Sequence, residues 1–130
     1  MKNIIKLTPT KAIIQILDAT ETISLDTDLL FTGVVQSGFI PQTVSGTPTV
    51  NITGVRYSLP ASSPSTNPTT ITRNGVKVLN LNGSQNHEFQ YSIISNNTSN
   101  IVVNCPSGGM VFLELNKIAG YSDVIPNVGA

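Results

Sequence analysis

The side chains that most often carry enzymatic chemistry are scarce in this sequence. His87 is its single histidine and Cys105 its single cysteine. A hydrolytic triad or an imidazole metal cluster needs further groups beside its histidine, and a cysteine nucleophile needs a base or a positive environment to form a thiolate. Neither residue has such a neighbour along the chain. We therefore expect His87 to be a polar strand residue and Cys105 a structural thiol, and we predict no catalytic residue.

Acidic residues gather at one place, and calcium is the ligand that they could hold. The group contains Asp18, Glu21, Asp26 and Asp28. Carboxylates from neighbouring loops can bind Ca²⁺, but the spacing of Asp26 and Asp28 lacks the glycine and the terminal glutamate of an EF-hand loop. We expect solvated carboxylates, some of them paired with lysines. Asp26 and Asp28 are the metal candidates, yet we predict that the protein needs no metal and no organic cofactor.

Some residues would suit a protein that cleaves or binds carbohydrate. Glu88 and Glu114 lie on expected strands with solvent-facing sides, but nothing places them across an aromatic cleft, as a glycosidase would require. Sugar-binding modules stack sugars on aromatic rings, and this chain has no tryptophan and three tyrosines, Tyr57, Tyr91 and Tyr121. A carbohydrate- or surface-binding module therefore stays open as an alternative, and an enzyme is not expected.

The charge balance excludes other partners. Seven basic residues meet seven acidic ones, so the formal net charge is zero, and charged residues make up 11% of the chain, against about 25% in ordinary domains. Nucleic-acid binding needs a basic patch, and the sequence has none. No apolar run approaches the ~20 residues of a membrane span, and no signal peptide is expected. Scarce charge favours packing against other protein surfaces.

The composition predicts an all-β protein. Ser, Thr and Asn account for 41 of the 130 residues, and Ile and Val for 26; β-branched residues suit a pleated sheet. Short apolar stretches recur between Gly, Pro, Asn and Asp, which is typical of a sandwich. We predict one domain over 1–130 that folds as an antiparallel β-sandwich or a jelly-roll-like sandwich. The expected strands are 2–7, 11–17, 21–25, 29–36, 49–57, 69–73, 76–81, 87–94, 100–104 and 110–118.

Apolar residues at every second position predict which side chains form the core. The predicted core residues are Phe31, Val50, Ile52, Phe89, Tyr91, Ile93, Val111, Leu113 and Leu115. Between Ile52 and Val55 the alternation changes phase at Gly54, which indicates a β-bulge.

Turn signals organise the second half of the chain. Asn74-Gly75 and Asn82-Gly83 suit tight hairpins, and 106–109 supplies a further turn, so we expect an antiparallel meander. Segments 37–48 and 58–70 read as long loops, and 119–130 reads as a tail that leaves the body.

The loop 58–70 is the predicted binding element. Pro60, Pro64 and Pro68 favour an extended chain, which lowers the entropy lost on docking. The segment has no charge to desolvate, and an extended arm can add to a neighbour's sheet edge. We therefore predict that Leu59, the three prolines and Tyr121 of the tail contact partner subunits, together with the N-terminal residues.

The short all-β body, the scarce charge, the Ser/Thr/Asn-rich surface and the proline-rich arm resemble small virion structural proteins of tailed bacteriophages. These include capsid decoration or cement proteins and the small β-sandwich adaptors of the neck and tail. The resemblance implies a non-enzymatic protein that binds between major capsid subunits or other virion proteins, often as a homo-oligomer such as a trimer, and strengthens the shell. It implies a place in the virion, after assembly in the host cytoplasm. A neck, tail or fibre component is the alternative within this class.

Overall fold

The computed structural model describes residues 1–31, 41–59, 69–81 and 84–122, and for 84–92 it describes the backbone alone. All regular structure in these ranges is β-strand, as predicted. The strands are β1 Lys2–Leu7, β2 Lys11–Leu17, β3 Thr20–Ile23, β4 Val44–Ser58, β5 Thr69–Arg73, β6 Val76–Leu81, β7 Ser84–Ile93, β8 Ile101–Asn104 and β9 Met110–Tyr121.

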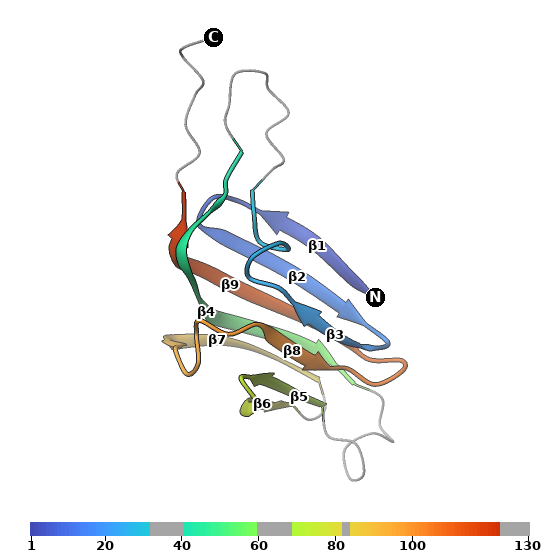
Figure 1. Ribbon diagram of the computed structural model, residues 1–130. Coiled ribbons are helices and arrows are strands. Elements are labelled where there is room, and N and C mark those ends of the chain that lie inside the picture. Colours follow the sequence, from blue (N-terminus) through green and yellow to red (C-terminus); the bar gives the residue numbers. More distant parts are fainter. Residues whose placement is uncertain (32–40, 60–68, 82–83, 123–130) are drawn as a thin grey trace, which may run out of the picture.

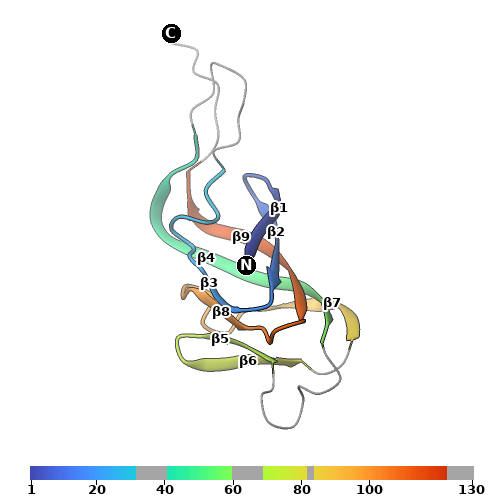
Figure 2. The ribbon, with the colours of Figure 1, turned by 90° about the vertical axis from the view of Figure 1, so that its right-hand side faces the viewer.

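The strands form two packed antiparallel sheets, one with the order β1-β2-β9-β4-β7 and one with the order β3-β8-β5-β6 (Figures 1 and 2). Four strand pairs are nested along the sequence, so that each pair encloses the next: β2 pairs with β9, β3 with β8, β4 with β7 and β5 with β6. Successive pairs lie in opposite sheets. This is the strand order of a jelly roll, so the predicted β-sandwich is confirmed.

The core between the sheets contains much of the predicted set. Val50, Ile52, Val111, Leu113 and Leu115 are buried. Ile93 packs against the core from a half-buried position. The prediction for Phe31 is wrong, because this residue is half-buried and stands outside the core cluster. The side chains of Phe89 and Tyr91 lie outside the described part of the chain.

Two local predictions are confirmed. The register of β4 shifts between Ile52 and Gly54 against both of its neighbours, which is the expected bulge. Asn74 and Gly75 have positive φ angles of 53° and 72° and join β5 to β6 in a tight hairpin. The second predicted hairpin, at 82–83, lies outside the described residues.

The predicted meander is wrong. From β5 onward, β5 and β6 are the only described strands that are both consecutive in sequence and paired, since each later connection crosses from one sheet to the other. The expected strand 29–36 does not form over its described part. The chain instead makes a turn over 25–29, in which Asp28 donates its N–H to the carbonyl of Ser24, and it has no regular structure at 30–31. The expected loop 37–48 ends early, because β4 starts at Val44.

The expected tail also begins later than predicted, since β9 continues to Tyr121. Near its end, β9 depends on the backbone conformation of Gly120, which has a φ of +84°. Between Val44 and Thr49, β4 bulges away from β9, and the backbone of the bulge lies against Gly120. A Cβ atom on Gly120 would stand 2.2 Å from the carbonyl oxygen of Thr47. No side chain fits at this position unless the bulge moves.

Replacement of Gly120 by Ala should therefore destabilise the fold more than the same change at Gly75. Both glycines have positive φ, which costs an alanine about 1–2 kcal/mol. A Cβ on Gly75 would meet nothing within 4 Å, whereas one on Gly120 meets backbone. Urea denaturation should show a loss for Gly120→Ala at least twice that for Gly75→Ala, and equal losses would contradict this packing.

Candidate functional site

A buried ammonium, that of Lys117 on β9, lies at the centre of a hydrogen-bond network. It is 6% exposed. Its Nζ donates hydrogen bonds to the carbonyl oxygens of Thr8, at 3.0 Å, and Leu29, and to Oε1 of Gln42. An ammonium has three donors, so all of them are used. Within the described ranges no carboxylate lies at ion-pair distance from it.

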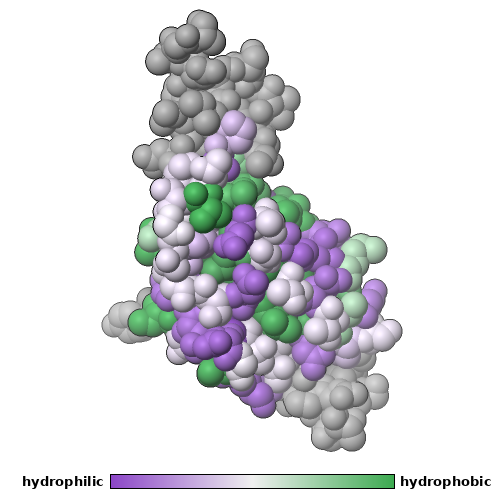
Figure 3. Space-filling view, viewed as in Figure 1, coloured by the Kyte–Doolittle hydropathy of each residue, from purple (hydrophilic) through white to green (hydrophobic). Residues whose placement is uncertain are grey.

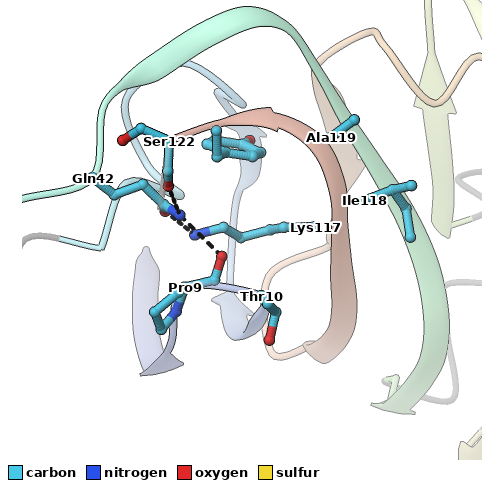
Figure 4. A pocket seen from close by; sticks show the side chains of 8 residues that line it. Pro9, Thr10, Gln42, Lys117, Ile118, Ala119 and Ser122 are labelled. Atoms are coloured by element: carbon cyan, nitrogen blue, oxygen red, sulfur yellow. Dashed lines mark hydrogen bonds between the residues drawn. The ribbon is translucent and has the colours of Figure 1, made fainter. Parts of the chain in front are cut away.

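Gln42 extends this network to two further segments. Its Nε2 donates to the carbonyls of Pro9 and Ser122, at 3.0 Å each. Its Oε1 also accepts from the backbone N–H of Phe31, at 3.2 Å. Figure 4 shows Lys117 reaching across a small pocket toward Gln42. We call Lys117, Gln42 and the carbonyls that they bind the lysine hub. It ties the β1–β2 turn, the chain after β3, the approach to β4 and the end of β9.

Tyr121 covers the lysine hub from one side. Nζ of Lys117 stands 4.7 Å from the centre of its ring, a distance at which a cation is attracted to the aromatic face. The tyrosine hydroxyl donates to the carbonyl of Leu25 at 2.7 Å. Burial and the negative charge of Asp26 raise the pKa of Tyr121. The ring therefore stays neutral over the physiological pH range and shields the ammonium from water.

Burial lowers the pKa of Lys117 to about 8. A lysine with a depressed pKa can serve as a nucleophile, but such an amine needs a free lone pair. Here the nitrogen donates every N–H to oxygen. The pocket beside it has a volume of about 130 Å³, well below the 300–1,000 Å³ of typical ligand sites. The lysine hub therefore joins chain segments by hydrogen bonds, and the pocket beside it is small.

A second buried cation, Arg73, forms hydrogen bonds between segments at another place in the sandwich. It ends β5 and is fully buried. Its guanidinium donates to the carbonyls of Val50, Asn97 and Ser99, with distances of 2.9 Å to Asn97 and 2.8 Å and 3.0 Å to Ser99. Burial lowers its pKa to about 10. Because Val50 belongs to the opposite sheet and Asn97 and Ser99 to the β7–β8 loop, Arg73 joins three segments.

Sequence reasoning missed both cations, although a signal for them exists. Leu115 is buried, and Lys117 is the next residue on the same face of β9. In the same way Arg73 follows the buried Ile71 on β5. A basic residue at the next core-facing position of an apolar alternation is the pattern that marks such a group.

The metal candidates are not arranged as a cation site. Asp28 bonds to the ammonium of Lys2 at 2.7 Å and accepts the N–H of Ser24, also at 2.7 Å. Asp26 is exposed. No group of three His, Cys, Asp or Glu side chains comes together in the described part of the chain. The expected pairing of an acidic residue with a lysine is thus observed at Asp28.

The other acids and the thiol have structural neighbours. Asp18 accepts the backbone N–H of Gly108 at 2.8 Å and so fastens the turn before β9. Glu114 is exposed, as expected. Cys105 is 3% exposed, and burial raises its pKa, which keeps it as a neutral thiol. Its prediction as a structural thiol agrees with this burial. The side chains of His87 and Glu88 are not described, although their backbone lies in β7 beside β4.

The predicted binding residues fall in two places. Leu59 and Tyr121 are half-buried, and both pack against the core of their own chain. Pro60, Pro64 and Pro68 lie outside the described residues. Of the tyrosines considered for sugar stacking, Tyr57 is 6% exposed and so offers no open ring face.

The chain was compared with protein families, curated proteins and solved structures, and none of them matches it. No helix long and apolar enough to cross a membrane occurs in the ranges that the structure describes. Function must therefore be inferred from the residues and their geometry.

Replacement of Arg73 by Met should cost about 2–5 kcal/mol of unfolding free energy, because the carbonyls of Val50 and Ser99 lose their donor at about 1–3 kcal/mol each. The matched control is Arg56→Met on β4, where the side chain is exposed and the loss should stay below about 0.5 kcal/mol. Denaturant titration measures both, and similar losses would show that Arg73 does not hold the two sheets.

In a Cys105→Ala background, which removes a buried thiol whose raised pKa would act in the opposite direction, the free energy of unfolding should rise with pH between about 8 and 9.5. The pKa of Lys117 falls from 10.5 to about 8 on folding, so in this window the unfolded chain binds more protons. Stability then increases by up to about 1 kcal/mol per pH unit. Arg73 titrates above this window. Tyrosine in the unfolded chain also titrates above it, with a pKa of about 10.

Lys117→Met in the same background is the control for this pH dependence. It should be less stable than the Cys105→Ala parent at every pH, since Leu29 and Gln42 lose a donor, and its stability should not rise over the window. Thermal melts at several pH values measure both effects. A rise of the same size in parent and variant would assign the effect to another group.

Proposed function

We propose that this protein is a non-enzymatic structural component of a virion, and that it acts as a capsid decoration protein that binds between capsid subunits. The observation that carries the proposal is a jelly roll whose buried charged groups are all used in its own hydrogen bonds, as far as the described residues show. Such a body offers its surface to a partner, and its buried cations Lys117 and Arg73 already donate to its own carbonyls.

The jelly roll recurs in viral capsid domains, lectins and cupins, and a fold alone does not fix a function. The residues favour the first class. A cupin holds its metal with several histidines, and this chain has one. A lectin stacks sugars on exposed rings, yet Tyr57 is buried and Tyr121 lies under Lys117. A sugar-binding role would need Tyr91, whose side chain lies outside the described part of the chain, or other residues.

The surface also supports an assembly role. Polar and apolar side chains are interspersed on the face seen in Figure 3. Since charged residues are 11% of the chain and the formal net charge is zero, few ions must be desolvated when this surface docks. The proposed partners are the major capsid protein or other virion proteins, and a place in the neck, tail or fibre is the alternative.

The test is the composition of purified particles of the virus whose genome encodes this chain. The protein should be present at a fixed copy number by quantitative mass spectrometry. Particles that lack it should assemble and then release their genome at lower temperature than complete particles. Absence from the particles would overturn the proposal, and antibody labelling at the tail would support the alternative. Binding in a glycan array would instead favour a sugar-binding module.

The predicted arm can be tested in the same particles. Residues 60–68 are replaced by a Gly-Ser linker of equal length, which leaves Leu59 on the core. The isolated domain should keep its melting temperature, and the copy number per particle should fall several-fold. An unchanged copy number would place the docking surface elsewhere on the sandwich.

A further inference from the structure

β1 is an edge strand with one free side. It pairs with β2, and no other strand in the described ranges joins it (Figure 1). The edge strand of the opposite sheet, β3, is partly blocked, because Lys2 donates to the carbonyl of Thr22 at 2.8 Å. The remaining edges, β6 and β7, border residues that the structure does not describe. β1, in contrast, lies within the continuous described range 1–31.

The hydrogen bonds at the two ends of β1 define which backbone groups face this free side. Leu17 donates its N–H to the carbonyl of Met1, and Thr8 donates its N–H to that of Lys11, at 2.8 Å each. In an antiparallel ladder, bonded and non-bonded pairs alternate. With one bulge at Ile5, this alternation turns the N–H and C=O groups of every second residue toward solvent. These residues are Lys2, Ile4 and Leu7.

Two isoleucines are exposed on the same strand. Ile4 is 46% exposed and Ile5 54%. Ile4 lies opposite Ile14, which is completely buried, so both side chains point to the core side of the sheet. Ile4 stays uncovered because the five-stranded sheet extends beyond the four-stranded one at this edge. An apolar side chain therefore stands next to free backbone donors and acceptors.

We propose that β1 pairs antiparallel with β1 of a second copy, about a two-fold axis that passes between the two Ile4 residues. The sheets of the two copies then join across the edge. In this register Ile4 exchanges both backbone hydrogen bonds with Ile4 of the second copy. Asn3 lies opposite Lys6, and Lys2 lies opposite Leu7. Each pair shares a face, because Lys2, Ile4 and Leu7 point inward while Asn3 and Lys6 point outward.

The charges fit this register and disfavour its neighbours. No lysine lies opposite a lysine, and Lys2 is already neutralised by Asp28 at 2.7 Å. An axis shifted to Lys6 would place two ammonium groups opposite each other. An axis shifted to Asn3 would place Lys6 opposite Met1 and leave Leu7 without a partner. Bulges and lysines normally protect an edge strand against pairing, and here they select one register.

This dimer should be reversible. Six residues form β1, and an edge of this length buries less than the 1,200–2,000 Å² of a standard stable interface. The formal net charge of zero removes repulsion between copies. The inference does not rest on the proposed function, since it concerns only how two copies of this chain meet.

Sedimentation velocity over micromolar to millimolar concentrations tests the pairing. The wild-type chain should pass from monomer to dimer, and Ile4→Lys should remain monomeric with an unchanged melting temperature, because two ammonium groups then meet at the axis. The control is Ile118→Lys on β9, where the isoleucine is 51% exposed and away from the edge. This control should dimerise like the wild type. A wild-type chain that stays monomeric, or equal effects of the two variants, would overturn the proposal.

A disulfide tests the register without relying on affinity. Opposite residues of a bonded antiparallel pair have Cα atoms about 5.5 Å apart, which a disulfide can span. Ile4→Cys should form a covalent dimer on mild oxidation, and Ile118→Cys should not. The native Cys105 is buried and should not compete. Failure of Ile4→Cys to cross-link at a concentration where the wild type is dimeric would exclude this register.

Discussion

The fold depends on the way one buried ammonium satisfies several converging backbone segments. Where a jelly roll closes, chain segments from different strands meet without a ladder to pair their carbonyls, and buried carbonyls without donors are costly. Lys117 and Gln42 supply those donors between them. An apolar residue at 117 would leave the oxygens unpaired, and a carboxylate would repel them. The chemistry of this end therefore requires a side chain with several hydrogen-bond donors on the inner face of β9.

Arg73 solves the same problem with a different geometry. Its flat guanidinium reaches carbonyls of one loop and of the opposite sheet at once, which the compact ammonium of a lysine could not do. Two of the seven basic residues are thus buried for structural reasons. The surface carries even less charge than the composition suggests. The low charge of the surface has two causes: its polar residues are mostly uncharged, and two cations are buried in the interior.

The accuracy of sequence-based prediction follows the range of the interactions. Strands, the bulge at Gly54 and the hairpin at Asn74-Gly75 are local, and period-two alternation with turn residues predicts them. The crossovers between sheets are not local, since a strand alternates in the same way in either sheet. Residues 44–48 looked like a loop because of Gly46 and Pro48, and their bulge is stabilised by Gly120, far along the chain. The roles of Lys117 and Arg73 could not be predicted from neighbouring residues, because their carbonyl partners come from distant segments.

These constraints also determine where the protein can interact. The described interior leaves one buried side-chain polar atom, Oγ1 of Thr69, without a partner, so there is little unused hydrogen-bonding capacity inside. A sandwich, unlike a closed barrel, keeps unpaired backbone at its edges. In a chain with so few charged residues, backbone groups at an edge are a regular array of donors and acceptors available to a partner. Recognition through an edge needs few specific side chains, which is consistent with a sequence that contains no compact motif for binding.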